Sequence, residues 1–212
     1  DMNDAIYRAA INEAGNPRTS GSWWGTGGNA PGVTPPERIC MLETMKAAIF
    51  DMDGTLLDSM TKWRELNGVF VRGMGITPTE KQEADMMSMS GTMVVDYFKK
   101  EFDIDTNFDA LCVKACEAME PVYSAGVPHK PGAAAYLKRL RARGVKCVVA
   151  TATPARLAMI GLNCANLVSD LDYIFTTDML NFNKSQNAFF ERVSEIIGVP
   201  KEDCVMFEDS LY

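Results

Sequence analysis

Residues 45–59 read MKAAIFDMDGTLLDS, and this stretch decides the fold class of the chain. Residues 47–50 form a short apolar run that is typical of a buried strand in a parallel sheet. The run is followed by Asp51-Met52-Asp53-Gly54, in which the glycine allows a sharp turn. Because ligands bind at the carboxyl ends of strands in open parallel sheets, we expect a functional site to begin at Asp51.

Buried strands and amphipathic helices alternate along much of the chain that follows. We expect further strands at 145–150, 173–176 and 204–207, with helices at 133–143, 154–163 and 189–197. Strands separated by helices of this length favour parallel pairing through crossover connections. The sequence therefore predicts an α/β fold with a three-layer, Rossmann-like parallel sheet.

Residues 59–126 interrupt the alternation with four helical stretches, at about 59–72, 78–87, 91–102 and 108–124, and no convincing strand. The block is too long for a simple crossover, so we expect a small all-helical cap inserted after the first strand. The predicted domains are a core of residues 45–58 and 127–212 and a cap of residues 59–126. The chain stops three residues after Asp209, and we expect one or more C-terminal strands of the core to be missing.

Residues 1–44 differ from the rest in composition. The stretch 16–36 is rich in Gly, Pro, Ser and Thr and shows no sustained helical or strand period. Such a segment favours a poorly ordered extension with no part in the chemistry. The alternative is that Trp23 and Trp24, which lie within it, anchor a partner, since tryptophan is common at interface hot spots.

The amino-acid composition limits the kinds of molecule that the protein is expected to bind. The net charge is -7 and 47% of the residues are hydrophobic, which argues for a globular core and against nucleic acid or an anionic membrane as a partner. No apolar run reaches the length of a membrane span. The six cysteines are interpreted as structural thiols in a reducing cytoplasm. We expect a monomer.

Polar side chains end each strong predicted strand. Asp51 and Asp53 follow the first strand, Thr151 ends the second, and Glu208-Asp209 follows the last. Three carboxylates from this group would suit Mg²⁺, which prefers oxygen ligands. A carboxylate can also act as a nucleophile in phosphoryl transfer, and a second one as general acid and base. Turn formation is the alternative role for the first pair of acids, and Thr153 is an alternative phosphate contact to Thr151.

These residues carry a family resemblance. DMDGTLLDS at 51–59 resembles the first motif of the haloacid dehalogenase superfamily, and the remaining motifs follow in order. VVAT ends at Thr151, Lys184 is expected at the start of a late helix, and VMFEDS contains the acidic pair. The helical insertion is similar to the cap of the phosphatase and β-phosphoglucomutase branch.

The resemblance implies a role for each matching residue. Asp51 resembles the nucleophile, which is also a metal ligand, and Asp53 resembles the acid/base, which also offers its backbone carbonyl to the metal. Thr151 and Lys184 resemble the phosphate clamp. The remaining metal ligands are implied to be Glu208 and Asp209, with Mg²⁺ as the cofactor. The family's dehalogenases lack the second aspartate, so Asp53 points to phosphate esters.

The expected partner is a small phosphorylated metabolite, and the expected activity is hydrolysis of a small-molecule phosphate monoester through an aspartyl-phosphate intermediate. Two alternatives stay open: a sugar phosphomutase of the β-phosphoglucomutase type, and an inactive truncated module that acts only in binding. The mutases carry an arginine shortly after a glycine of the cap loop, whereas Gly91 is followed here by Thr-Met-Val-Val. Ser90, Gly91 and Thr92 are the predicted specificity loop.

Overall fold

The computed structural model describes residues 42–89 and 93–209. The predicted extension, apart from its last three residues, and the predicted loop Ser90, Gly91 and Thr92 lie outside these ranges. Contacts divide the chain into two compact units, one made of Asp1–Asp58 and Val127–Tyr212 and the other of Ser59–Gly126.

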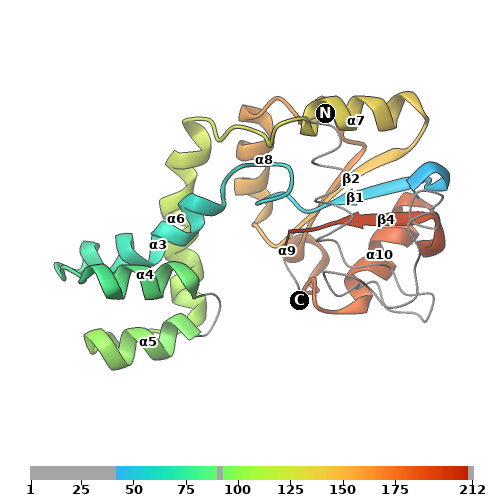
Figure 1. The fold of residues 1–212 in the computed structure, drawn as a ribbon. Coiled ribbons are helices and arrows are strands. Elements are labelled where there is room, and N and C mark those ends of the chain that lie inside the picture. The colour runs from blue at the N-terminus through green and yellow to red at the C-terminus, as the bar shows by residue number, and fades with distance from the viewer. Residues whose placement is uncertain (1–41, 90–92, 210–212) are drawn as a thin grey trace. The chain divides into compact units, whose positions relative to one another are not determined.

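The first unit contains a four-stranded sheet with the order β3-β2-β1-β4, in which every pairing is parallel (Figure 1). The strands are β1 (Ala47–Phe50), β2 (Lys146–Thr151), β3 (Tyr173–Thr176) and β4 (Cys204–Phe207). The prediction of an α/β fold with a parallel sheet is confirmed. Because β1 lies between β2 and β4, the residues that follow these three strands are brought to one edge of the sheet.

Helices cover both faces of this sheet (Figure 1). They are α7 (Ala133–Ala142), α8 (Ala155–Cys164), α9 (Thr177–Leu180) and α10 (Asn187–Ile197), with short 3-10 turns at Val168–Asp170 and Lys201–Asp203. Residues of one β1 face, such as Ile49, share a buried cluster with Phe189 and Phe190 of α10. On the other face, Phe50 meets the ring of Tyr136 of α7 edge to face. Because successive side chains of a strand point to opposite faces of the sheet, β1 packs against helices on both faces.

The second unit contains helices joined by short loops, and no strand, among its described residues. It consists of α3 (Met60–Gly73), α4 (Glu80–Ser88), α5 (Met93–Phe102) and α6 (Phe108–Ser124). Its core gathers Val71, Met86, Val94 and Phe98. A capping box starts α4, in which the Thr79 side chain accepts from the Gln82 backbone N–H and the Gln82 side chain accepts from that of Thr79.

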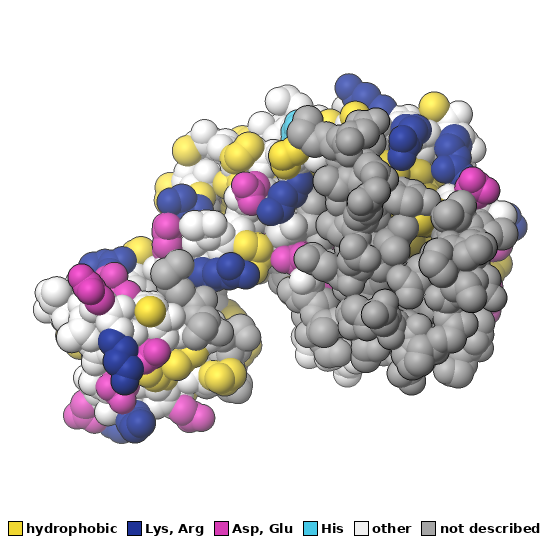
Figure 2. All heavy atoms as spheres, viewed as in Figure 1, with side chains coloured by type: hydrophobic (Ala, Val, Ile, Leu, Met, Phe, Trp, Pro, Cys, Tyr) yellow, Lys and Arg dark blue, Asp and Glu magenta, His cyan; other side chains and the backbone are white. Residues whose placement is uncertain are grey.

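Charges of both signs are mixed on the face drawn in Figure 2, where Lys and Arg side chains of the described residues are interspersed with Asp and Glu. No helix among the described residues is both long enough and apolar enough to span a bilayer.

Candidate active site

The site starts where β1 ends. Asp51 is 5% exposed, and its backbone N–H donates to the carbonyl of Phe207 on β4 at 2.9 Å. The chain then closes a tight loop, in which Gly54 has φ 89° and donates to the Leu57 carbonyl at 2.9 Å. Glycine is required there because other residues rarely adopt positive φ. The loop fixes the backbone of Asp53 next to the buried Asp51.

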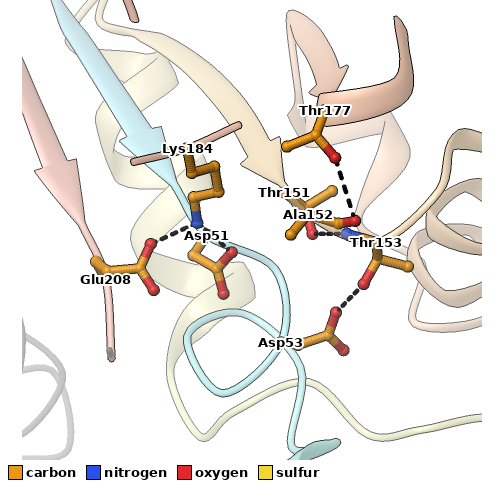
Figure 3. A network of polar contacts seen from close by, with 8 residues as sticks. All are labelled: Asp51, Asp53, Thr151, Ala152, Thr153, Thr177, Lys184 and Glu208. Carbon is orange, nitrogen blue, oxygen red and sulfur yellow. Dashed lines mark hydrogen bonds and ion pairs between the residues drawn. The ribbon is translucent and has the colours of Figure 1, made fainter. Parts of the chain in front are cut away.

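Lys184 reaches this edge of the sheet from the turn before α10. Its side chain is buried, and the ammonium nitrogen lies 2.7 Å from Asp51 Oδ1 and 2.5 Å from Glu208 Oε2 (Figure 3). The sequence placed this lysine at the start of the helix, whereas the structure places it before the first helical residue, Asn187. One buried cation thereby joins two carboxylates, which offsets the cost of removing these charges from water.

Burial strongly raises the pKa of the Asp51 carboxyl. This pKa is raised from the ordinary value to about 8, and removal from water is the largest cause. Lys184 lowers the pKa, whereas the nearby carboxylate of Glu208 contributes to the increase. The ionised form of Asp51 therefore needs more positive charge than one lysine supplies.

A cluster of carboxylates provides a place for that charge. Asp51, Glu208 and Asp209 each offer an oxygen, and these oxygens lie within 4.8 Å of one another. An all-oxygen set that leaves room for water and phosphate fits Mg²⁺. The side chain of Asp53 is not part of this cluster. The family resemblance implies that its backbone carbonyl binds the metal, and that role stays a prediction.

The second strand brings two threonines to the same edge. Thr151, the last residue of β2, is buried, and its hydroxyl oxygen accepts the backbone N–H of Thr153 at 3.0 Å. Thr153 is also buried, and its hydroxyl donates to Asp53 Oδ2 at 2.7 Å (Figure 3). Sequence reasoning considered Thr153 only as a phosphate contact and missed this bond. The available signal was the spacing of two hydroxyl residues, two positions apart, directly after a strand.

The structure thus assembles most of the predicted site within the first unit. Lys184 contacts both Asp51 and Glu208, and Asp209 lies within the same carboxylate cluster as these two acids. Asp53 is linked to the β2 side through Thr153. The predicted specificity loop, Ser90, Gly91 and Thr92, lies outside the described residues.

Comparison with known proteins decides the family. Residues 45–212 match the family of haloacid dehalogenase-like hydrolases. The chain belongs to this family. The match spans β1 to β4 and includes every residue of the site described above.

Individual relatives agree with the assignment. The phosphorylated carbohydrates phosphatase of Thermotoga maritima is 26% identical over 166 residues, which cover 78% of this chain and 77% of that protein. A crystal structure from the same organism, named a candidate β-phosphoglucomutase, superposes with a TM-score of 0.63 at 26% identity, covering 78% and 77% of the two chains. YfnB of Bacillus subtilis, solved bound to magnesium, shares the fold with a TM-score of 0.55 at 18% identity, covering 72% and 74%.

Proposed function

We propose that this haloacid dehalogenase-like hydrolase is a Mg²⁺-dependent phosphatase that cleaves small phosphate monoesters with Asp51 as the nucleophile. The observation that carries the proposal is that the buried Asp51, at the end of the central strand β1, contacts Lys184 and belongs to a carboxylate cluster that could hold a cation. A buried carboxylate whose charge is balanced by a lysine and a bound cation is suited to attack at phosphorus.

The reaction has two steps in this proposal. A carboxylate oxygen of Asp51 attacks phosphorus, the ester P–O bond breaks, and the leaving oxygen takes a proton from Asp53. Asp53 then takes a proton from a water molecule that attacks the phosphorus of the aspartyl phosphate. The P–O bond to Asp51 breaks, inorganic phosphate leaves, and both carboxyl groups return to their starting state.

The remaining residues bind and neutralise the phosphoryl group. Lys184 is a fixed positive charge beside Asp51, and such a charge stabilises the transition state without reorganisation. The Thr151 hydroxyl accepts from Thr153, which leaves its own hydrogen to donate to a phosphate oxygen. Asp51, Glu208 and Asp209 would hold Mg²⁺, which supplies Lewis-acid charge neutralisation when bound; magnesium in the related structure of YfnB supports this choice of metal.

The relatives and the sequence that follows Gly91 indicate the class of substrate and reaction. A relative that acts on phosphorylated carbohydrates favours a small sugar or polyol phosphate. A phosphomutase is the second candidate, because a structure of similar fold carries that name. Hydrolysis is favoured because Thr-Met-Val-Val follows Gly91, without the arginine expected of the mutases. A monomeric state and a cytoplasmic location stay predictions.

Release of p-nitrophenol from p-nitrophenyl phosphate, with and without Mg²⁺, tests the proposal. We expect turnover that requires Mg²⁺ and falls below detection in Asp51→Asn. The matched control is Asp203→Asn, which changes a surface carboxylate that pairs with Lys46 and leaves turnover intact. Equal turnover in Asp51→Asn and the wild type would contradict the proposed nucleophile.

A further inference from the structure

The hydroxyl of Thr153 makes the contact that connects the two sides of the site. It donates to Asp53 Oδ2 at 2.7 Å across 100 residues of sequence, from the loop after β2 to the loop after β1 (Figure 3). Thr153 is 6% exposed, so little water is available to compete for this bond. A hydrogen bond to an ionised carboxylate is among the stronger kinds in proteins, and one end of this bond is buried.

The residues before and after Thr153 in the sequence hold its backbone in place. Its backbone N–H is held by the Thr151 hydroxyl at 3.0 Å. Pro154 follows with φ -55° and α8 begins at Ala155, so the proline ring restricts rotation at this point. The hydroxyl therefore projects from a rigid strand-to-helix connection, which is the kind of support that a positioned acid requires.

We propose that Thr153 is a positioning residue that directs the carboxyl group of Asp53 for proton transfer. A hydroxyl that donates to Oδ2 places a proton of the neutral carboxyl on Oδ1. The oxygen that gives and takes the proton is thereby fixed, together with its direction. This inference rests on the proposed phosphatase function, in which Asp53 is the general acid and base.

A positioning role and a phosphate-binding role predict different kinetics. If Thr153 bound phosphate, its loss would weaken competitive inhibition by inorganic phosphate. If it positions Asp53, phosphate inhibition stays unchanged, and the loss depends on how much the leaving group needs a proton. Phenolate leaves with more need of a proton than p-nitrophenolate, which is much the weaker base.

The experiment measures kcat/KM for phenyl phosphate and for p-nitrophenyl phosphate with Mg²⁺ present. The variants are Thr153→Val, which removes the hydroxyl at similar size, and Thr153→Ser, which restores it. Thr177→Val is the matched control, because the Thr177 hydroxyl bonds the Ala152 carbonyl of the same loop at 3.4 Å and makes no bond to Asp53. Thermal unfolding of each variant shows whether it folds.

We expect Thr153→Val to lower kcat/KM for phenyl phosphate by about 10- to 100-fold. The loss for p-nitrophenyl phosphate should be clearly smaller, Thr153→Ser should recover most of the activity, and Thr177→Val should match the wild type. Equal losses on both esters, no loss, a gain of activity, or weakened phosphate inhibition would overturn the positioning role. A wild type inactive on both esters would instead overturn the phosphatase proposal on which it rests.

Discussion

At the scale of single residues, Asp51 gives the site a measurable pH dependence. Its pKa is about 8 in the folded protein, against about 3.9 in an unfolded chain. Between these values the folded state holds more protons than the unfolded state, so this residue makes stability fall as pH rises from about 4 to about 8. The cause is chiefly burial, which penalises the ionised form.

We expect urea unfolding in a metal chelator to show this effect as a difference between two proteins. The free energy of unfolding of the wild type, relative to Asp51→Asn, should decrease from pH 4 to pH 8 and then level off. Added Mg²⁺ should reduce the decrease, since a cation favours the ionised carboxylate. A difference that does not change across this pH range would contradict the buried setting of Asp51.

Some of the site residues could be predicted from the sequence pattern, and others could not. Asp51, Thr151 and Glu208 could be placed together because the carboxyl ends of parallel strands converge at one edge. Lys184 comes from a turn, and only the family resemblance identified it. The spacing of Thr151 and Thr153 could have marked Thr153 as a site residue. Its partner, Asp53, could not be predicted, because the bond depends on side-chain torsions and on two loops that no periodic pattern describes.

At the scale of elements, α4 depends on its capping box for its first turn. The Thr79 hydroxyl oxygen accepts from the Gln82 backbone N–H at 3.3 Å, and the Thr79 N–H donates to Gln82 Oε1 at 2.9 Å. We expect Thr79→Ala to cost about 1 kcal/mol of stability and to speed amide exchange at the start of α4. Denaturant unfolding and hydrogen exchange measure the two effects.

Thr61→Ala provides the comparison for this prediction. Thr61 is exposed within α3, where alanine has the higher helix propensity, so we expect no loss of stability. If the two variants unfold alike, the capping box contributes nothing to α4.

The long helices and the four strands were predicted well, whereas single-turn helices were missed. The predicted helix 108–124 matches α6, although Pro121 lies inside it, and the predicted strand 173–176 matches β3. The four-residue helix α9 was missed because a single turn is too short for an apolar period to show. The Thr176 side chain accepts from the Met179 backbone N–H and caps this helix. Threonine is a common N-cap residue, but Thr176 was read only as the end of the predicted strand.

At the scale of the whole molecule, the order of the strands explains why the site needs distant parts of the sequence. The central strand β1 supplies Asp51, its neighbour β2 supplies Thr151, and its other neighbour β4 is followed by Glu208 and Asp209. Each group is far from the others along the chain, so the site exists only when the sheet is formed. The central claim is that the phosphoryl group is transferred to the carboxylate of Asp51 at this edge of the sheet before water releases it.

Trapping the covalent intermediate tests that claim most directly. The full chain would be mixed with Mg²⁺ and p-nitrophenyl phosphate, quenched in acid within one turnover, reduced with borohydride and digested for mass spectrometry. We predict reduction of the phosphorylated carboxyl to homoserine at position 51, and none when Mg²⁺ or substrate is omitted. Turnover that leaves Asp51 unmodified, or modification at a different carboxylate, would contradict the account.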